Sequence, residues 1–508
     1  MRQTTCSRRL TNKEIAHSPA PALRAGTELE LSFTDLLANG QAVGRASGLV
    51  VFCFGPLPQE RARVRITSVK PKYATATMVR LLVGSPHRAT PFCPVFGSCG
   101  GCQVQHLNYP AQLAWKTDVV RSALQRIGGF ADVEVRRAVG MANPRAYRNK
   151  MSLVVDHTAQ TPTIGFYQQR SHDIVPIEDC PIVTPQLNTF VHVFNRARTM
   201  QDTAPTMQVA RHIVSRSARA TGDAVVTVTT AQLSPEVERG AIPLLKALPG
   251  AVGLTNSYQL TSQNAIMGRR HRVVAGVSEI EEEIDGVRYR VSAGSFFQVN
   301  VEIVGRIFSF MKNGLEHPRR VVDLYCGAGT FSLFFAKNGC QVYGIEENPQ
   351  AIIEADDNAR LNGLEQWVRF RAGRVEDVVR SPEAGEAMRE SDIVFLDPPR
   401  KGSDEVTLGA IAASKVPYIW YLSCDPATLA RDLKFLAANG YRLGIVQPFD
   451  MFPQTGHVET LVTLYREDQA DEEVVHDAFL NVPWPTWPER DEFAADEPEY
   501  PDFVIRED

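Results

Sequence analysis

The 508-residue sequence has no apolar run approaching the ~20 residues that a membrane-spanning helix needs. Its first 23 residues lack the apolar core of a secretory signal, so we expect a cytoplasmic protein. The nine cysteines are an odd number, which in such a compartment argues against a disulfide framework. No internal repeat is evident. A composition of 44% hydrophobic and 22% charged residues excludes collagen-like, coiled-coil and wholly disordered chains.

Negative charge is concentrated at the C-terminal end. Residues 467–508 contain fifteen acidic and two basic side chains, so this segment carries −13 while the rest of the chain carries +9. The segment is also rich in proline, and we expect it to be disordered, as we expect for residues 1–23. A basic body with an acidic, proline-rich tail is compatible with a polyanionic partner.

Residues 24–85 are predicted to form a small β-barrel of the oligonucleotide-binding type. Short strand patterns such as RARVRITSVK alternate with turns and include no helix. Five cationic residues lie on or beside these strands: Arg61, Arg63, Arg65, Lys70 and Lys72. They suit nucleic-acid contact, although a solvated basic face is an equally good interpretation.

Residues 86–290 are predicted to form a central mixed α+β domain. It begins with a cysteine-containing segment, continues through the helical pattern AQLAWKTDVVRSALQRIGG and then becomes rich in strands. The strings RAYRNKMSLVV and IGFYQQRSHDIVPIEDC combine cations with aromatic rings, as binding of single-stranded RNA requires. Ordinary amphipathic strands are the alternative interpretation.

Residues 291–466 alternate apolar strands with helices, which predicts a parallel sheet covered on both faces. The last two strands have a short, non-helical connection and should form an antiparallel hairpin. This order is typical of a Rossmann-like methyltransferase sheet. The predicted fold class is therefore α/β plus β, with an N-terminal barrel, a central domain and a C-terminal methyltransferase domain.

The segment VVDLYCGAGTFSLFF indicates a nucleotide-binding turn. Gly327 and Gly329 let the backbone approach a ligand closely between a buried strand and a helix N-terminus. Glu346 ends the next strand and suits two ribose hydroxyls, and Asp377 follows the third strand on the adenine side. Three such features on successive strands predict binding of S-adenosylmethionine.

The fourth and fifth strands end in reactive side chains. Asp397 opens a DPPRKG loop, and Cys424 stands in SCDP immediately before a helix whose N-terminus should lower the pKa of the thiol. A thiolate beside a methyl donor suggests covalent catalysis, although a small buried cysteine is the plainer interpretation. Glu459, in GHVETLV, is an acid within an apolar strand that we place at the start of the terminal hairpin. It suits a base or a structural salt bridge.

Eight motifs occur in an order that resembles the RNA uracil-5-methyltransferase family: CGGCQVQH, YRNK, the GFY–RSHDIV–C string, FFQVN, DLYCGAGTFSL, DPPRKG, SCDPATLARD and HVETLV. The resemblance covers about residues 24–466. It is closest to the branch that modifies 23S ribosomal RNA and has a TRAM domain and a [4Fe-4S] cluster.

The resemblance implies a role for each matched residue. The nucleophile falls on Cys424 and the proton acceptor on Glu459. The contacts to S-adenosylmethionine fall on Gln298, Tyr325, Thr330, Glu346, Asp377 and Asp397, beside the glycines of the turn. The cluster ligands fall on Cys93, Cys99, Cys102 and Cys180, whose spacing alone would suit zinc nearly as well.

The implied reaction is methylation of C5 of a uridine in ribosomal RNA. The target base must leave its stack to be reached, and Phe296 or Phe297, beside Gln298, suits stacking on it, with a structural role for the other ring. The implied partner is RNA, with no membrane, and the protein is expected to be a monomer. The alternatives are uridine methylation in transfer RNA, N-methylation of a nucleic-acid base, which the DPP loop suggests, and a non-catalytic RNA-binding iron–sulfur protein.

Overall fold

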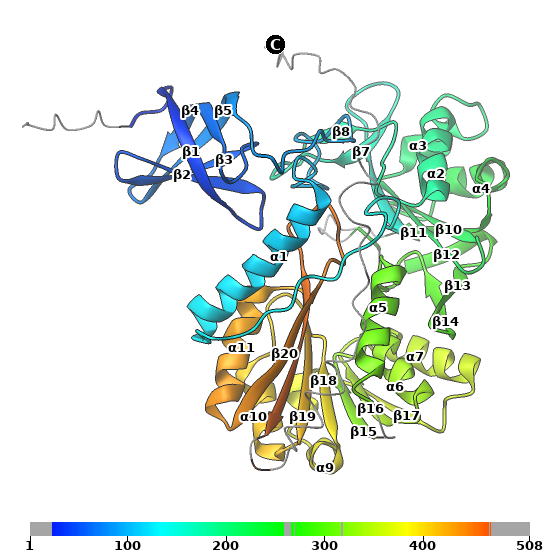
Figure 1. The fold of residues 1–508 in the computed structure, drawn as a ribbon. Coiled ribbons are helices and arrows are strands. Elements are labelled where there is room, and N and C mark those ends of the chain that lie inside the picture. Colours follow the sequence, from blue (N-terminus) through cyan, green and yellow to red (C-terminus); the bar gives the residue numbers. More distant parts are fainter. Residues whose placement is uncertain (1–22, 259–265, 269, 316–318, 467, 469–508) are drawn as a thin grey trace, which may run out of the picture. The chain divides into compact units, whose positions relative to one another are not determined.

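The structure, a computed structural model, describes residues 23–258, 266–268, 270–315, 319–466 and 468 (Figure 1). These residues divide into two compact units. The first extends to Pro91 and includes Gln103–Asn108; the second comprises Phe92–Cys102 and the chain from Tyr109 onward. Within the described ranges, no helix is both long and apolar enough to cross a membrane.

The first unit contains a closed five-stranded barrel, as predicted. Its strands are β1 (Glu28–Leu36), β2 (Gln41–Ala46), β3 (Leu49–Phe54), β4 (Arg61–Val69) and β5 (Tyr73–Val83), in the order β1-β2-β3-β5-β4. Strand β4 alternates buried and exposed residues, so Ala62, Val64 and Ile66 fill the barrel while its arginines point outward.

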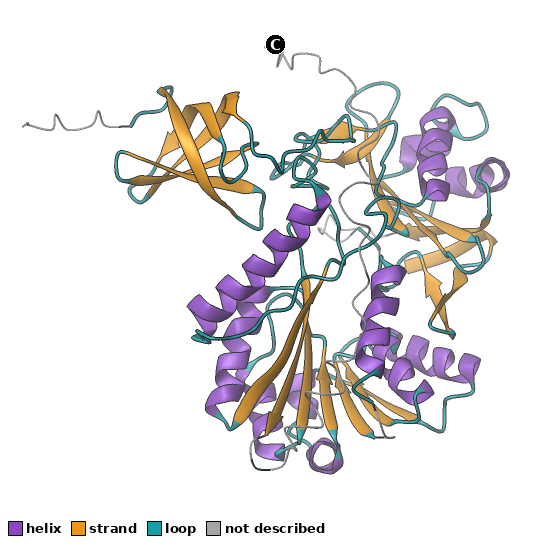
Figure 2. Cartoon of the chain, viewed as in Figure 1, coloured by secondary structure: helices purple, strands orange, loops and turns teal. Residues whose placement is uncertain are grey.

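The second unit contains a seven-stranded sheet in the order β12-β11-β10-β9-β6-β7-β8. Its strands are β6 (Lys150–Asp156), β7 (Thr163–Tyr167), β8 (Ile174–Pro176), β9 (His212–Ser217), β10 (Ala224–Thr230), β11 (Ala251–Tyr258) and β12 (Arg270–Gly276). Helices α2 (Pro185–Ala197), α3 (Ala204–Val209) and α4 (Pro235–Ala247) accompany this sheet (Figure 2). Leu187 and Phe190 of α2 and Leu244 of α4 belong to one hydrophobic core with its strands.

A second seven-stranded sheet has the order β17-β16-β15-β18-β19-β21-β20. Its strands are β15 (Arg320–Leu324), β16 (Gln341–Glu346), β17 (Val368–Ala372), β18 (Ile393–Leu396), β19 (Tyr418–Ser423), β20 (Tyr441–Phe449) and β21 (Glu459–Arg466). Strands β15–β19 are parallel, and β21 runs antiparallel to both β19 and β20. The predicted parallel sheet with a terminal antiparallel hairpin is therefore observed.

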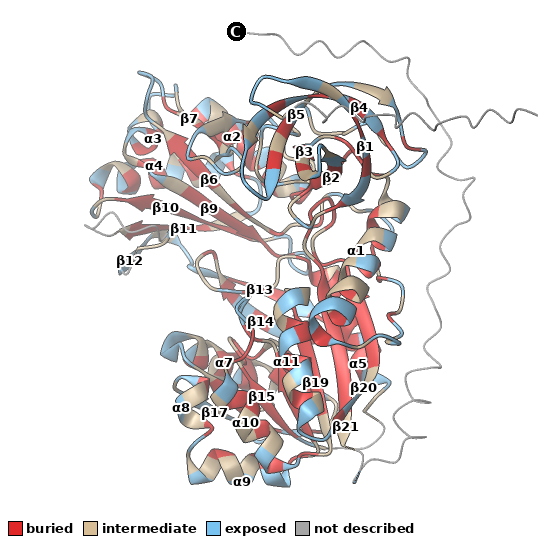
Figure 3. Cartoon of the chain, turned by 90° about the vertical axis from the view of Figure 1, so that its left-hand side faces the viewer, coloured by how far each residue is buried: buried red, intermediate tan, exposed pale blue. Residues whose placement is uncertain are grey.

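Helices cover both faces of this sheet, and its central strands are buried on both sides (Figure 3). Ile393 and Phe395 of β18 face one core, with α5 (Val301–Lys312), α6 (Thr330–Lys337) and α7 (Pro349–Asn362). Val394 and Leu396 face the other. That core contains α8 (Val375–Val378), α9 (Pro382–Glu390), α10 (Glu405–Ser414) and α11 (Pro426–Ala438).

Two elements from before residue 291 also pack on the methyltransferase-type sheet. Helix α1 (Tyr109–Ala123) and the π-turn η1 (Leu124–Gly128) share a core with α11. The hairpin of β13 (Glu279–Ile284) and β14 (Val287–Ser292) shares the opposite core with α5 and α6. The sequence predicts the helix but not the β13–β14 hairpin, nor the sheet that each one covers.

Candidate functional site

The parallel strands of the second sheet deliver the predicted site residues to a single edge. Tyr325 and Gly327 follow β15, Glu346 ends β16, Asp377 lies in α8 after β17, and Asp397 follows β18. Cys424 follows β19. Because all five strands run in the same direction, these carboxyl ends meet on one side of the sheet.

The turn after β15 forms a cradle around Glu346. The Gly327 backbone N–H donates to Glu346 Oε2 over 3.2 Å, and the Asn348 N–H donates to Oε1 over 2.8 Å. Gly327 has φ = +54°, and a Cβ added there would meet nothing within 4 Å, so open space lies beside this backbone. Gly329 has φ = +83° and lies against Ala355 of α7, where a Cβ would be 3.3 Å from the alanine methyl group.

Tyr325 has a positive φ of 70°, a conformation that non-glycine residues rarely adopt and that gathers at functional sites. Its hydroxyl lies 3.0 Å from Ser403 Oγ, which follows the DPPRKG loop. Thr330 is the first residue of α6, and its carbonyl accepts a hydrogen bond from the Tyr289 hydroxyl at 3.0 Å.

Strand register places Cys424 beside Glu459. Ser423, at the end of β19, is opposite Thr460 of the antiparallel strand β21. Cys424 follows Ser423 and Glu459 precedes Thr460, so these two residues are neighbours. We predicted that Glu459 lies on the first strand of the terminal hairpin. It begins β21, which is the second strand. The insertion of β21 between β19 and β20 creates this juxtaposition.

Burial governs protonation in the site. Glu459 is 7% exposed, and its Oε2 has no hydrogen-bond partner among the described residues. Burial, and next the carboxylate of Asp397, raise the pKa of Glu459 well above its usual range. Burial also raises the pKa of Asp397 to about 7.

The predicted lowering of the pKa of Cys424 is wrong. Burial raises it to about 12, and the carboxylates of Glu459 and Asp397 add to the shift, while Arg400 opposes it. Helix α11 does begin just after the thiol, but Asp425 caps it by accepting hydrogen bonds from the N–H groups of Ala427 and Thr428. This carboxylate satisfies the helix N-terminus and itself repels a thiolate.

Two residues beside the reactive groups were given no role by sequence reasoning, although both stand in the quoted motifs. Arg400 of the DPPRKG loop lies with Nη2 3.4 Å from Nε2 of His457. Burial and the guanidinium of Arg400 lower the pKa of His457 to about 4, so this ring is neutral at pH 7. Arg400 also favours the charged form of both Cys424 and Glu459.

The loop between β20 and β21, which leads to Glu459, is held by buried polar contacts. Lys116 of α1 forms an ion pair with Asp450, and neither side chain is more than 1% exposed. Lys116, Asn300 and Tyr147 also donate to the backbone carbonyls of residues 452, 451 and 453, at 3.0, 3.0 and 3.1 Å. The base candidate is therefore fixed from three other segments of the chain.

The segment FFQVN separates its two phenylalanines. Phe297 is 3% exposed and packs on Tyr289 with ring centroids 5.4 Å apart, so it is a core residue. Phe296 is 79% exposed and is the ring available for stacking. The carbonyl of Gln298 accepts a hydrogen bond from Asn149 Nδ2 at 3.3 Å, which fixes this segment to the start of β6.

The four predicted cluster cysteines are all half-buried, and none of them is in a disulfide. Burial raises the pKa of Cys180 to about 11, and the nearby thiols of Cys99 and Cys93 add to the shift. The loop that carries Cys99 lies against the end of β7, because the Gly100 N–H donates to the Tyr167 carbonyl at 3.0 Å. Across the described ranges, no group of three or more Cys, His, Asp or Glu side chains is arranged to hold a single metal ion.

The cations predicted for RNA contact are partly neutralised. In the barrel, Arg63 and Arg65 of β4 pair with Glu30 and Glu28 of β1 at 3.2 and 3.0 Å. In the second unit, the guanidinium of Arg145 stacks 4.1 Å from the Phe92 ring centroid. Among the described parts of the chain, Lys150 and Arg148 form no ion pair.

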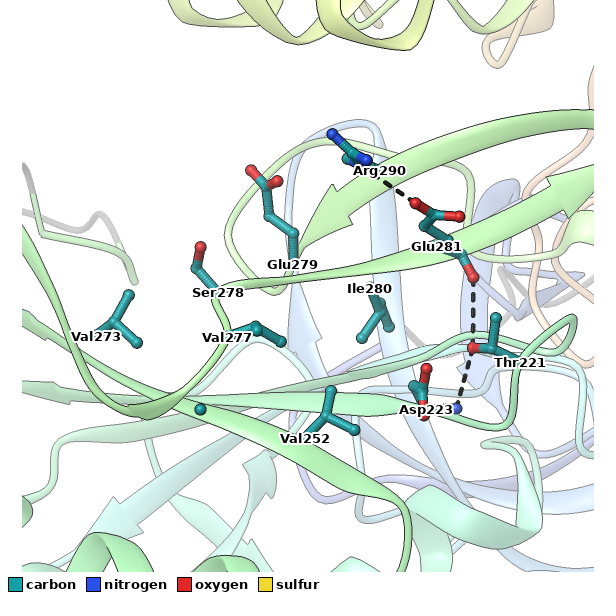
Figure 4. Close-up of a pocket in the computed structure, with 11 residues that line it drawn as sticks. Thr221, Asp223, Val252, Val273, Val277, Ser278, Glu279, Ile280, Glu281 and Arg290 are labelled. Atoms are coloured by element: carbon teal, nitrogen blue, oxygen red, sulfur yellow. Dashed lines mark hydrogen bonds and ion pairs between the residues drawn. The ribbon is translucent and has the colours of Figure 1, made fainter. Parts of the chain in front are cut away.

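A pocket of about 750 Å³ lies away from these residues, between β12 and the β13–β14 hairpin (Figure 4). Asp223, Glu279 and Glu281 line it, and Arg290 is paired with Glu281 at 3.3 Å. None of the predicted site residues lines this pocket. Its acidic lining does not suit a nucleic-acid phosphate.

Comparison with known proteins gives matches along most of the chain. A family model described as tRNA (Uracil-5-)-methyltransferase matches residues 108–467, and a TRAM domain model matches residues 23–79. An uncharacterized RNA methyltransferase of Bacillus cereus is 35% identical over 455 residues, which cover 87% of this chain and 98% of that protein. Another from Nostoc sp. is 37% identical over 449 residues, covering 86% and 96%.

A solved structure has a similar fold. It is the Pyrococcus abyssi tRNA (uracil-54, C5)-methyltransferase in complex with S-adenosyl-L-homocysteine. It superposes with a TM-score of 0.66 at 25% identity and covers 86% of this chain and 100% of that chain.

Proposed function

This chain belongs to the RNA uracil-5-methyltransferase family, and from that premise we propose that it methylates C5 of a uridine in 23S ribosomal RNA by covalent catalysis. The observation that carries the proposal is the pairing of β19 with β21, which sets the Cys424 thiol beside the Glu459 carboxyl group. A nucleophile and a base side by side at the carboxyl edge of the sheet are what C5 methylation of a uracil requires.

S-adenosylmethionine supplies an electrophilic methyl group on a cationic sulfur. The residues proposed to hold it are Gln298, Tyr325, Gly327, Gly329, Thr330, Glu346, Asp377 and Asp397. Their chemistry fits a cation with a ribose. Asp323, Asp397 and Glu459 are acids whose pKa values burial raises, to about 8 for Asp323. Open space beside Gly327 and the carboxylate of Glu346 suit the ribose.

The proposed chemistry begins at Cys424. Its thiolate adds to C6 of uracil, and the electron pair of the C5–C6 bond makes C5 nucleophilic. C5 takes the methyl group while the electron pair of the broken methyl–sulfur bond stays on the sulfur of the donor. Glu459 removes the C5 proton, and the S–C6 bond breaks to release 5-methyluridine and the thiolate. A raised pKa suits Glu459 to this role, because the ionised form of such a carboxyl group is a stronger base.

Arg400 is the group we propose to favour the thiolate. Its guanidinium opposes the rise in pKa of both Cys424 and Glu459. His457 beside it is neutral at pH 7, so Arg400 is the cation of this pair.

A [4Fe-4S] cluster on Cys93, Cys99, Cys102 and Cys180 is part of the proposal. The thiols of Cys93, Cys99 and Cys180 influence one another electrostatically, and Cys102 and Cys180 both act on Tyr147, so the four share one neighbourhood. Each thiolate of such a cluster binds a different iron, so the four sulfurs stand farther apart than four ligands of one ion. Anaerobic purification should give a brown protein with four iron and four acid-labile sulfide atoms per chain; stoichiometric zinc instead would refute the cluster.

Transfer RNA is the second candidate substrate, because the solved structure described above is a transfer-RNA enzyme by its name. Ribosomal RNA is preferred because the chain combines a TRAM barrel with the four-cysteine set, as the resembled branch does. The proposal also holds the protein to be a monomer, which size-exclusion chromatography with light scattering tests.

The test supplies labelled S-adenosylmethionine with unmodified transcripts of 23S ribosomal RNA and of transfer RNA, for the wild type and Cys424→Ala in parallel. We expect 5-methyluridine in the ribosomal transcript and none with Cys424→Ala, which should still bind RNA. Product in transfer RNA alone would overturn the substrate. Label on a base nitrogen, or an active Cys424→Ala variant, would overturn covalent catalysis.

A further inference from the structure

Two cationic side chains converge on one backbone carbonyl of the FFQVN region. Lys150 Nζ, on β6, donates to the Ser295 carbonyl at 3.2 Å, and Arg216 Nη2, on β9, donates to the same oxygen at 3.0 Å. Arg148, two residues before Lys150, bonds through Nε to the Lys150 carbonyl at 3.0 Å. Lys150 and Arg216, from neighbouring strands, thus converge on Ser295, with Arg148 beside Lys150. Ser295 precedes the exposed ring of Phe296.

This cluster has more donors than acceptors. Arg216 is fully buried, and its Nε and Nη1 have no hydrogen-bond partner among the described residues. Within the same residues, the terminal nitrogens of Arg148 make no hydrogen bond. The carboxylates that act on Arg216, of Glu282 and Glu354, do not act on Lys150.

The excess of positive charge destabilises the protonated form of Lys150. Burial, and then the charges of Arg216 and Arg148, lower its pKa to about 7. Like charges held together in a partly buried site are unfavourable unless an anion joins them. Lys150 and Arg148 are each only partly buried, so an anion from outside can reach them, whereas Arg216 lies behind them.

The cluster is also close to the reaction site. Arg148 acts electrostatically on His457, the neighbour of Arg400, and Asn149, between the two cations, bonds the Gln298 carbonyl. An RNA strand with a base extruded toward Cys424 must therefore have its backbone near these strands if Phe296 stacks on it.

We propose that Arg148 and Lys150, backed by the buried charge of Arg216, bind a backbone phosphate of the RNA next to the extruded uridine. The site takes a phosphodiester of single-stranded RNA and not a base edge, because its groups are cationic donors without acceptors. The identity of the neighbouring base as the target uridine rests on the proposed function, whereas the binding of the phosphate does not.

The first test measures binding of oligouridylate to the full-length protein by fluorescence anisotropy over a range of salt concentrations, without methyl transfer. Lys150→Gln and Arg148→Gln should each bind several-fold more weakly. Each should lower the slope of log affinity against log salt by about 0.7, the value for one lost phosphate contact on a single strand. Lys150→Arg should keep the wild-type slope. Lys246→Gln, an exposed cation at the end of α4, is the matched control and should change nothing.

The second test locates the phosphate. The transcript that the wild type methylates is ethylated at random on its phosphates, and bound molecules are sequenced. Ethylation beside the methylated uridine should block binding of the wild type and weaken binding of Lys150→Gln much less, because that variant keeps only the Arg148 contact. An unchanged salt slope in Lys150→Gln and Arg148→Gln, with intact binding of S-adenosylhomocysteine, would overturn the site. If no transcript is methylated, the proposed function fails while the oligouridylate result still decides the phosphate site.

Discussion

The buried ion pair of Lys116 and Asp450 offers a quantitative test of how the base loop is held. For both groups, burial is the largest influence on the pKa and exceeds the attraction of the partner: the pKa of Lys116 is lowered and that of Asp450 is raised. The pair as a whole therefore adds little net stability. Removing one partner nevertheless leaves a buried charge uncompensated, which costs about 3–5 kcal/mol.

Lys116→Met should accordingly lower the free energy of unfolding by about 3–5 kcal/mol. That loss corresponds to a fall of roughly 5 °C in the thermal midpoint of the unit that contains this pair. In the double variant Lys116→Met/Asp450→Asn no charge is left unpaired, and Asn keeps an acceptor for the Tyr109 hydroxyl. We expect the double variant to regain all but about 1–2 kcal/mol.

The assay is urea unfolding followed by circular dichroism, with methyl transfer measured on the same preparations. Lys116→Met should also lower kcat, because the loop it anchors leads to Glu459. The reasoning that an unpaired buried charge dominates the loss of stability would be refuted by either of two results. One is a Lys116→Met variant as stable as the wild type, and the other is a double variant no more stable than the single one.

Three further outcomes follow from the site. Glu459→Gln should lower turnover about 10²–10⁴-fold and accumulate a covalent protein–RNA adduct, since the C5 proton stays in place. A denaturing gel detects the adduct, and its absence would contradict the role of Glu459. Arg400→Gln removes a charge that opposes the rise in pKa of the Cys424 thiol. The rising limb of its pH–rate profile should therefore move alkaline by about one unit, or 1.4 kcal/mol, and an unmoved limb would count against this role. Glu346→Ala should weaken binding of S-adenosylhomocysteine about tenfold in calorimetry while RNA affinity stays unchanged, since only the cradle at Gly327 is lost.

Much of the architecture was predictable because it depends on local patterns. The buried strand runs, the glycine turn and the acid after each strand are all visible in short windows, and β15–β19 then follow the parallel order. The eight motifs identified the family, and the comparisons confirm it. The closed barrel was likewise predictable from alternating residues such as those of β4.

The arrangement of the reactive groups was less predictable. Cys424 and Glu459 are 35 residues apart, and they meet only because β21 inserts between β19 and β20. We expected the N-terminus of α11 to lower the pKa of Cys424, but that expectation left out Asp425. Asp before Pro426 is an N-cap pattern, and its carboxylate accepts hydrogen bonds from those N–H groups. The contact of Arg400 with His457 likewise joins two loops that no local pattern connects.

The raised pKa values in the site imply an order of events in the proposed reaction. Cys424, Asp397 and Glu459 lose water on burial, and each carboxylate that ionises makes the next ionisation harder. The thiol is therefore protonated in the free protein at pH 7. A cationic donor offsets the charge of these carboxylates, so its binding favours the thiolate. Addition to C6 then removes that negative charge from sulfur before Glu459 has to act as a base. In the proposed reaction, the thiolate of Cys424 therefore forms after the donor binds, and not before.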